Sequence, residues 1–391
     1  MKILMLHNHY LVSGGEDQAT SAEVDLLRKH GHEVELLEQD NHRVEQLGKV
    51  QTALRTVWSS ESYRWINNKL KKDKFDVMHV QNFFPLWSPS IYYAAARNKV
   101  PVVQTLHNYR LMCVNSLFYR DGHACEDCLG ALLPWRGVLH RCYRDSRAAS
   151  AVVAAMVGTH KLIRTWTKHV HAYVTVSEFA REKFIADGGL PEGRIFVRPN
   201  FIDPAPLVGS GGGGYAIYVG RLSMEKGIET MLQAWSTGQN VLPLKIVGDG
   251  PLREKVIAAS TATPVIEYLG SRTFSEVLEL MRHAEFLVFP SEVYETMGRT
   301  IMEAFAVGTP AVVSAMGAHG SAVTEGENGF LFSPGDIADL RNRIEWCSAN
   351  LQHLRSMRAN ARAEYEAKYS GAMNARKLLE IYRIAQEQTR Y

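Results

Sequence analysis

The chain has 391 residues, more than the range over which a single hydrophobic core keeps growing, so two domains are expected. Hydrophobic residues make up 46% and charged residues 22%, a composition that excludes a largely disordered chain. The formal net charge is only +3 and the basic residues form no dense cluster, which argues against a nucleic-acid partner.

The apolar runs and the N-terminus lead to an expectation about location. No apolar run reaches the roughly 20 residues that a membrane-spanning helix needs, and residues 148–157 predict a buried helix instead. Residues 1–6 already have the pattern of a strand rather than of a signal peptide. We therefore expect a cytoplasmic protein that works at the cytoplasmic face of the membrane. The first 200 residues hold 26 basic and 20 acidic side chains, which would favour anionic lipid or a phosphate-bearing acceptor, or would simply form a solvated surface.

Short apolar stretches alternate with helical patterns through the first half of the chain. In chain order, strands are predicted at residues 1–7, 33–38, 75–82, 100–108, 171–177 and 194–200, and a helix is predicted at 16–29. This alternation is typical of a parallel sheet whose strands are joined by helices.

The alternation breaks at residues 199–214, where three prolines and a Gly/Ser run predict a linker. Strands are predicted again at residues 215–220, 243–250, 265–270, 285–290 and 310–314, and the tail at 361–391 has a helical pattern. The chain is therefore expected to be α/β, with two doubly wound parallel-sheet domains that face a central cleft. The expected boundaries are residues 1–198 for the first domain, 199–214 for the linker, 215–365 for the second domain, and 366–391 for a helix that crosses back to the first domain.

The first junction between a strand and a helix carries Gly14 and Gly15. Ser13 and Glu16 have the spacing of a capping box, so the glycines would open the helix. Amides at such a helix start can bind a phosphate or sugar oxygen, although a plain tight turn explains the glycines equally well. The chain lacks the G-x-G-x-x-G pattern at this junction, which argues against a dinucleotide cofactor.

Two cations follow the first strand of the second half. Arg221 comes directly after residues 215–220, and Lys226 precedes a glycine and a helix. Cations at the carboxyl end of a parallel strand can neutralise a diphosphate, and a diphosphate leaving group needs this neutralisation. The alternative is that both are solvated surface charges.

Two glutamates occupy a strand–loop–helix stretch near the C-terminal end of the second domain. Glu295 lies in the loop after residues 285–290, and Glu303 lies in the helix that would begin after Thr296. Seven residues of helical rise would place Glu303 roughly 10 Å further along, about the distance from a sugar or diphosphate to a ribose. Glu303 lies among apolar neighbours, where an idle carboxylate would be unusual. The amides of Met297 and Gly298, with that of Thr296, could bind phosphate at the helix start.

His107 ends the predicted strand at residues 100–108 and therefore points at the same edge of the sheet. Its imidazole could hydrogen-bond a sugar hydroxyl or the reacting centre, or it could be structural.

Four cysteines follow His107 closely. The pair Cys125 and Cys128 has the spacing that zinc ligands favour, and Cys113 and Cys142 would complete four thiolates. A structural zinc that fixes this loop is predicted, with unbound thiols in a mobile loop as the alternative.

Several segments together resemble the retaining glycosyltransferases of family 4, which have the GT-B fold of two Rossmann-like domains. The matching segments are SGGE, TLHN, YVGRLSMEKGIE, IVGDGP, VYETMGRTIMEAFAVGTPAVVS and GENGFLFSPGD, which are spread over nearly the whole chain. The chain departs from the family pattern at residues 296–298, which read Thr-Met-Gly where many members have Gly-Phe-Gly. It departs again at Asn108, where many members have Asp, so a role for that carboxylate cannot be carried over.

The resemblance implies a nucleotide-sugar donor, held mostly by the second domain, and an acceptor bound by the first. It implies His107 and Glu295 as the residues beside the transferring sugar, transfer with retention, and no catalytic metal. The expected donor contacts are Gly14, Gly15, Arg221, Lys226, Gly248, Arg272, Thr296, Met297, Gly298 and Glu303.

The expected function is transfer of a hexose, glucose from UDP-glucose, to a glycan or lipid-linked acceptor in bacterial surface-polysaccharide assembly. A catalytically silent nucleotide-sugar-binding protein and a nucleotide-sugar epimerase of the same fold remain alternatives. The missing glycine pattern argues against a third hypothesis, an NAD-dependent dehydrogenase.

Overall fold

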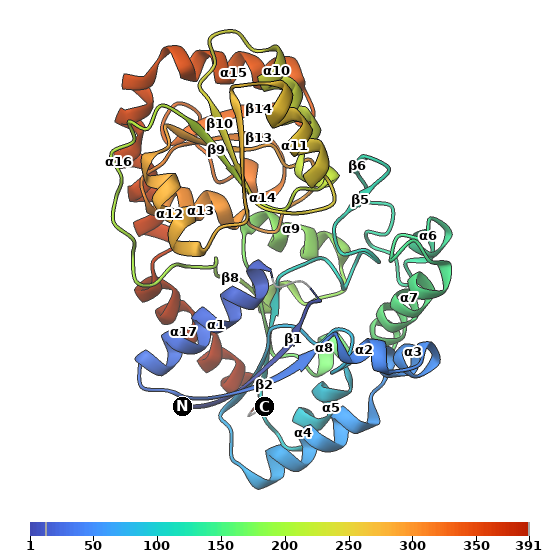
Figure 1. Ribbon diagram of the computed structural model, residues 1–391. Coiled ribbons are helices and arrows are strands. Elements are labelled where there is room, and N and C mark those ends of the chain that lie inside the picture. Colours follow the sequence, from blue (N-terminus) through green and yellow to red (C-terminus); the bar gives the residue numbers. More distant parts are fainter. Residues whose placement is uncertain (12–13, 390–391) are drawn as a thin grey trace. The chain divides into compact units, whose positions relative to one another are not determined.

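The computed structural model describes residues 1–11 and 14–389, with every side chain in these ranges except that of Glu45. The chain forms two compact units (Figure 1). The first contains Met1–Phe118, Cys125–Asn200 and the segment from Ala372 onward, and the second contains Tyr119–Ala124 and Phe201–Gly371.

The first unit is built on a six-stranded parallel sheet with the order β2-β1-β3-β4-β7-β8. The run Ile3–Leu6 is completely buried, as expected for a parallel strand that is covered on both faces. The strands are β1 (Lys2–His9), β2 (Glu33–Asp40), β3 (Val77–Val80), β4 (Val102–Leu106), β7 (Ala172–Thr175) and β8 (Ile195–Val197).

Helices connect these strands, and the predicted buried helix at residues 148–157 is confirmed as part of α7. Ser146 caps that helix by accepting a hydrogen bond from the amide of Ala149 at 3.3 Å. The helices are α1 (Gly15–Lys29), α2 (Arg43–Gln46), α3 (Lys49–Val57), α4 (Ser60–Lys72), α5 (Ser90–Arg97), α6 (Trp135–Leu139), α7 (Arg147–Leu162), α8 (Thr165–Lys168), α9 (Glu178–Asp187) and α17 (Gly371–Thr389), with a 3-10 turn at Glu192–Arg194.

The last helix, α17, completes the core of the first unit. Leu378, Ile381 and Tyr382 pack in one buried cluster with Ile3 and Met5 of β1. The helical pattern at 361–391 is not one continuous helix, because the chain leaves the helical conformation at residues 369–370, between α16 and α17.

The second unit has its own six-stranded parallel sheet with the order β11-β10-β9-β12-β13-β14. The strands are β9 (Ala216–Val219), β10 (Leu244–Val247), β11 (Ile266–Gly270), β12 (Phe286–Phe289), β13 (Ala311–Ser314) and β14 (Gly329–Phe332). The helices are α10 (Ile228–Thr237), α11 (Arg253–Ala262), α12 (Phe274–His283), α13 (Arg299–Ala306), α14 (Gly317–Gly320), α15 (Ile337–Ala349) and α16 (Leu351–Lys368), with a 3-10 turn at Met224–Lys226. A short hairpin, β5 (Tyr119–Arg120) and β6 (His123–Ala124), groups with this unit.

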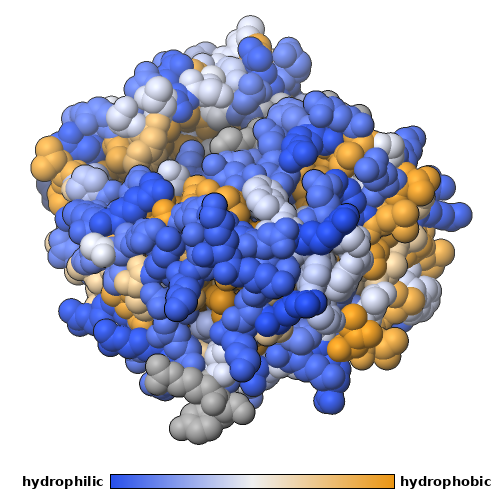
Figure 2. All heavy atoms as spheres, turned by 90° about the horizontal axis from the view of Figure 1, so that it is seen from below, coloured by the Kyte–Doolittle hydropathy of each residue, from blue (hydrophilic) through white to orange (hydrophobic). Residues whose placement is uncertain are grey.

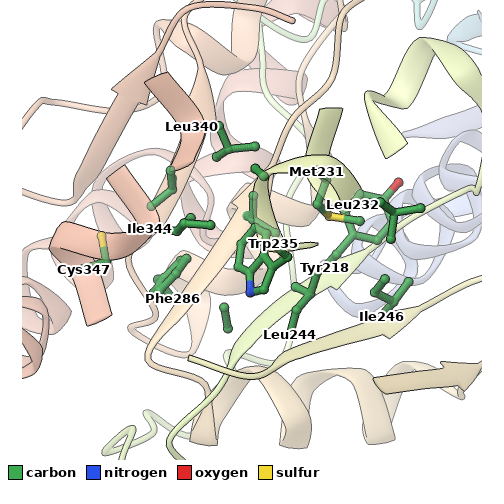
Figure 3. Packing of buried hydrophobic residues seen from close by; sticks show 14 of the residues in the cluster. Tyr218, Met231, Leu232, Trp235, Leu244, Ile246, Phe286, Leu340, Ile344 and Cys347 are labelled. Carbon is green, nitrogen blue, oxygen red and sulfur yellow. The ribbon is translucent and has the colours of Figure 1, made fainter. Parts of the chain in front are cut away.

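Large apolar side chains from strands and helices that are far apart in the sequence fill the core of the second unit. Trp235 of α10, Phe286 of β12 and Ile344 of α15 converge in one buried cluster (Figure 3). Cys347 belongs to this cluster, and burial raises the pKa of its thiol to about 12. This cysteine is therefore an apolar core residue.

Both sheets have the doubly wound topology that the sequence predicts. The strand order changes direction between β1 and β3 in the first unit and between β9 and β12 in the second. In open α/β sheets, ligands bind outside the carboxyl ends of the strands at such a reversal. The loops after these four strands are therefore where a site is expected. In the described part of the chain, no helix is both long enough and apolar enough to span a membrane.

Candidate functional site

The loop after β9 and the end of β12 meet closely in the second unit. Gly227 has φ of +67°, and a Cβ atom there would lie 1.9 Å from the carbonyl oxygen of Pro290. Only glycine fits this position, because a larger residue would be strained and would push the two loops apart. This contact places Lys226, the residue before Gly227, beside the loop that carries Glu295.

Lys226 and Glu295 form an ion pair in the structure. The carboxylate of Glu295 also accepts a hydrogen bond from the hydroxyl of Ser291 at 2.8 Å. Burial disfavours the charged form of Glu295, but Lys226 and His319 more than offset this effect and lower the pKa of the carboxyl. The predicted sugar-facing carboxylate and a predicted diphosphate cation are therefore brought together as one charged pair.

Glu303 is buried on the first turns of α13, with 6% of its surface exposed. Burial raises the pKa of its carboxyl, and the guanidinium of Arg299, which donates to it at 2.9 Å, opposes the shift. The helix begins at Arg299, two residues later than the sequence predicts, because Gly298 adopts a left-handed conformation with φ of +74°. Thr296 and Met297 therefore belong to the turn that precedes the helix.

His319 is a site residue that the sequence analysis missed. It lies in the short helix α14 after β13, and its Cβ lies 3.1 Å from where a side chain on Gly298 would begin. Its Nε2 lies 2.9 Å from the hydroxyl of Ser314, whereas its Nδ1 has no hydrogen-bond partner among the described residues. Burial lowers the pKa of this imidazole to about 4, so the ring is neutral near pH 7. The available signal was its place shortly after the predicted strand at residues 310–314, near the edge of the sheet where a site is expected.

The remaining predicted donor residues of the second unit lie at the same edge of this sheet. Gly248 has φ of +144°, and a Cβ atom there would lie 1.9 Å from the carbonyl oxygen of Gly220, so it allows the loops after β9 and β10 to approach. Arg221 is exposed after β9. Arg272 is exposed after β11, where its guanidinium donates to the carbonyl of Ser271 at 3.1 Å. The structure thus brings Lys226 into contact with Glu295, whereas no hydrogen bond or ion pair in the described part of the chain joins Arg272 to the other predicted donor residues.

His107 of the first unit begins a buried chain of hydrogen bonds. Its Nε2 lies 2.8 Å from Oε1 of Gln81, and the amide of Gln81 donates to the carboxylate of Glu23 at 2.6 Å. Glu23 also pairs with Arg198 and with His79, and these partners outweigh its burial and lower its pKa to about 2.

This chain determines the tautomer of His107. An ionised Glu23 can only accept hydrogen bonds, so the NH2 group of Gln81 faces it and the carbonyl of Gln81 faces His107. Burial lowers the pKa of His107 to about 3, so the ring is neutral. His107 therefore carries its proton on Nε2, which donates to Gln81, and Nδ1 is the acceptor nitrogen.

The glycine junction after β1 differs in part from the expectation. The Gly14 amide donates a hydrogen bond to the carboxylate of Asp17 at 2.8 Å. The sequence predicted Glu16 as the capping carboxylate. The predicted partner Ser13 lies outside the described residues. The Gly14 amide therefore already has an internal acceptor, while Gly15 is the first residue of α1.

Glu16 instead belongs to a group beside His107. Its carboxyl accepts from the hydroxyl of Tyr10 at 2.9 Å, and the amide of Asn108 donates to that hydroxyl at 3.0 Å. Burial raises the pKa of Glu16 to about 8, so the carboxyl is largely neutral near pH 7. Asn108 stands where many family members have Asp, and the protonated carboxyl of Glu16 is joined to it through the hydroxyl of Tyr10. Tyr10, His107, Asn108 and Arg110 line a small pocket of about 30 Å³, enough for about one water molecule.

The structure does not support the predicted zinc site. In the described part of the chain, His7, His9 and Asp17 are the one set of three potential metal-ligand atoms within 4.8 Å, and no such set contains Cys113, Cys125, Cys128 or Cys142. Burial raises the pKa of Cys113, and it raises that of Cys128 to about 11, so both sulfurs are protonated thiols in the metal-free chain. The thiol of Cys113 donates to the side-chain oxygen of Asn115 at 2.9 Å, which a protonated sulfur can do.

Comparisons with known proteins agree with this arrangement. Residues 20–206 match the family model described as Glycosyltransferase Family 4, and residues 206–364 match Glycosyl transferases group 1. An uncharacterised glycosyltransferase of Methanocaldococcus jannaschii is 25% identical over 65% of this chain and 72% of its own length. A glycogen synthase of Mycobacterium tuberculosis is 35% identical, but the match covers 32% of this chain and 31% of that protein.

Solved structures show the same fold. The crystal structure of HepE from Anabaena in complex with UDP superposes with a TM-score of 0.67 at 18% identity, over 97% of this chain and 99% of that one. The two family models together run from residue 20 to residue 364, across both parallel sheets. The chain belongs to the family 4 glycosyltransferases, which have the GT-B fold.

Proposed function

We propose that the chain transfers a hexose, glucose from UDP-glucose, with retention of configuration to a glycan or lipid-linked acceptor in bacterial surface-polysaccharide assembly. The observation that carries the proposal is the ion pair of Lys226 with Glu295 at the carboxyl edge of β9 and β12. UDP and UDP-glucose are the ligands named for the HepE structures, which supports this choice of donor.

The charges of the second unit suit a diphosphate donor. Arg221 and Lys226 supply the positive charge that a departing diphosphate needs, so the reaction proceeds without a catalytic metal. When the diphosphate binds, the ammonium group of Lys226 donates to the phosphate oxygens and interacts less strongly with Glu295. Glu295 is then left to accept hydrogen bonds from the hydroxyls of the sugar.

Glu303 is the proposed partner of the ribose. Its carboxyl is buried, and Arg299 holds it in place at 2.9 Å, so two ribose hydroxyls would find a preoriented acceptor. Gly298 and the turn at Thr296 and Met297 supply amides near the start of α13, where an anion is favoured.

The first unit is proposed to hold the acceptor. His107 lies in a pocket with Asn108 and Arg110, and its neutral ring can exchange hydrogen bonds with sugar hydroxyls. Work at the cytoplasmic face of the membrane, with a peripheral contact to it, is part of this proposal.

Substitutions in the second unit test the assigned roles. Glu303→Ala is expected to weaken UDP binding by about tenfold to a hundredfold, since it removes hydrogen bonds to a buried charged group worth roughly 1.5–3 kcal/mol. Glu295→Ala and His107→Ala should lower kcat with a smaller effect on UDP affinity. Isothermal titration with UDP and turnover of UDP-glucose measure the two effects. Unchanged UDP affinity in Glu303→Ala would contradict the ribose role, and UDP binding without any transfer would favour a silent binding protein.

A further inference from the structure

An unusual share of the exposed apolar surface lies on three neighbouring helices of the first unit, α3, α6 and α7, and on the residues next to their ends. The large apolar side chains exposed there, which we call the apolar face, are Val50, Leu54, Leu132, Leu133, Trp135, Leu139, Leu162 and Ile163. Val50, Leu54 and Leu162 are 74%, 68% and 69% exposed, so nothing in the first unit covers them. Monomeric soluble proteins rarely expose apolar groups together in this way unless a partner covers them.

Contacts within the unit show that these residues lie close together. Helices α3 and α6 both pack against α7. The imidazole of His160 on α7 lies 2.9 Å from the carbonyl oxygen of Val57, which joins the end of α3 to the turn of α7 that carries Leu162. A Cβ atom on Gly158 of α7 would lie 2.8 Å from Leu133, so the loop before α6 lies on the same helix. Figure 2 shows hydrophobic colour gathered on the right-hand side, where Figure 1 draws α3, α6 and α7.

The apolar face contains a groove between α6 and α7 of about 560 Å³. Leu133, Trp135 and Leu139 form one wall, and Ala151 and Ala154 of α7 form the floor. Small floor residues and apolar walls leave room for a stretch of hydrocarbon chain. Arg147 is the one charged residue that lines the groove, so a phosphate group could lie at its rim.

Basic side chains outnumber acidic ones around the apolar face, although Arg136 lies 3.7 Å from Asp127 and Lys161 pairs with Asp187 at 2.7 Å. Residues 130–168 contain seven basic side chains, Arg136, Arg141, Arg144, Arg147, Lys161, Arg164 and Lys168, and a single acidic one, Asp145. The guanidinium of Arg136 lies 5.7 Å from the ring centre of Trp135. An amphipathic aromatic ring with a basic neighbour is typical of the boundary between water and a lipid bilayer.

We propose that the apolar face binds an anionic lipid bilayer. The leucines and Trp135 enter the boundary between head groups and acyl chains, and Arg136 and Arg147 contact lipid phosphates. The surface identifies the partner for the membrane contact within the proposed function and rests on that function. Such a contact would hold the first unit next to a lipid-linked acceptor.

Binding of the full-length chain to vesicles tests the proposal without any donor. The chain should sediment with vesicles of phosphatidylcholine and phosphatidylglycerol, and more weakly with phosphatidylcholine alone. Added salt should weaken the binding, because it screens the arginines. Failure of the wild-type chain to bind the anionic vesicles would overturn the proposal.

Two double variants separate the apolar and the charged contributions. Leu54→Ser with Leu139→Ser should lower vesicle binding by about tenfold or more, since each exposed leucine would otherwise be buried in the bilayer. Arg136→Gln with Arg147→Gln should lower it on the order of tenfold and remove part of the salt dependence. Leu207→Ser is the matched control, because Leu207 is 74% exposed in the second unit. Equal binding by all of these variants would refute the assignment to this face.

Two further measurements distinguish a lipid partner from a second copy of the chain and from a folding defect. If the chain forms dimers without vesicles, and the leucine variant abolishes them, the face binds a second copy and the lipid proposal fails. A UDP-dependent rise in melting temperature should persist in every variant, which shows that each one folds. If the wild-type chain binds vesicles but UDP gives no rise, the proposed donor fails while the lipid surface stands.

Discussion

Burial keeps the His107 ring neutral, and its neighbours determine which ring nitrogen carries the proton. Gln81 fixes the proton on Nε2 by presenting a carbonyl, and Glu23 fixes Gln81 by accepting from its amide. A ring with a defined acceptor nitrogen offers a substrate hydroxyl one orientation instead of two. Gln81 is therefore a positioning residue, because it acts through His107.

Replacing Gln81 tests this arrangement. Gln81→Met keeps the side-chain length but removes both hydrogen bonds, so His107 can rotate or change tautomer. We expect kcat to fall on the order of tenfold to a hundredfold, as for a misplaced catalytic group, while the KM for the donor changes little. Steady-state kinetics with varied donor measures both. Gln39→Met, at a buried glutamine of β2, is the control and should keep the wild-type rate. An unchanged kcat in Gln81→Met would contradict the positioning role of Gln81.

Glu16 makes stability depend on pH in a direction opposite to that of most carboxylates. Burial raises its pKa from 4.5 to about 8, so between these values the folded state holds a proton that the unfolded state has lost. The contribution to stability is complete below about pH 4.5 and is lost as the pH rises to about 8. Glu16→Gln keeps the neutral form at every pH.

Thermal unfolding of the two proteins across the pH range measures this effect. The melting temperature of Glu16→Gln should be close to wild type near about pH 5 and should exceed it near about pH 9. Asp25→Asn, on the exposed face of the same helix, should follow the wild-type profile. A constant difference between wild type and Glu16→Gln at all pH values would show that Glu16 ionises normally.

At the scale of elements, one arginine joins the ends of two helices to the linker in the second unit. Arg358 of α16 is 6% exposed and donates to the carbonyls of Arg282 and Ala284 at the end of α12, each at 3.0 Å. It also donates to the carbonyls of Val307 after α13 and Gly209 in the segment before β9. The carbonyls of Arg282 and Val307 also accept from the amides of Gly211 and Gly209. The carbonyls of Ala284 and Gly209 are therefore the buried groups whose pairing depends on the guanidinium.

Arg358→Leu should therefore destabilise the second unit. Each buried carbonyl left without a donor costs roughly 1–3 kcal/mol, and the total loss should be about 3 kcal/mol or more after relaxation. Urea unfolding followed by circular dichroism measures the loss. Gln352→Leu, at an exposed site on the same helix, should cost much less. Equal losses for the two variants would mean that the helix ends do not depend on Arg358.

The sequence predicts the elements better than their contacts. Apolar runs such as residues 285–290 identify strands, since a parallel strand covered on both faces has no other pattern. Strand β14 was missed because its four residues GFLF lie within a turn-rich stretch. The start of α13 was placed two residues early because an isolated glycine does not reveal a left-handed φ.

The site was predicted in the same uneven way. Glu295, Lys226 and His107 follow predicted strands, so their place at a sheet edge could be inferred. Gln81 and His319 were missed because their roles depend on which strands are neighbours, and the strand order changes direction at β1 and β9. The cysteine spacing suggested zinc, but spacing alone does not show whether the four sulfur atoms come together in the fold.

At the scale of the whole molecule, each of the two units has its own hydrophobic core. Tyr382 of the C-terminal helix belongs to the first core, with no exposed surface, and its hydroxyl lies 2.7 Å from Nδ1 of His79. Trp235 and Phe286 belong to the second core. The proposed UDP contacts all belong to the second unit apart from the two glycines at residues 14 and 15. Stability and ligand binding should therefore be separable between the two units.

Calorimetry of the wild-type chain and of Tyr382→Ala tests this separation. Removing a large buried ring costs about 3–5 kcal/mol, so Tyr382→Ala should lower the melting temperature of the first unit. UDP at about 100 times its Kd should add roughly 2.7 kcal/mol to the second unit, because it binds only the folded form. We expect two transitions in the variant, with UDP raising the upper one and leaving the lower one nearly unchanged. A single transition that UDP raises as a whole would show instead that the two cores unfold together, since the ligand would then stabilise both at once.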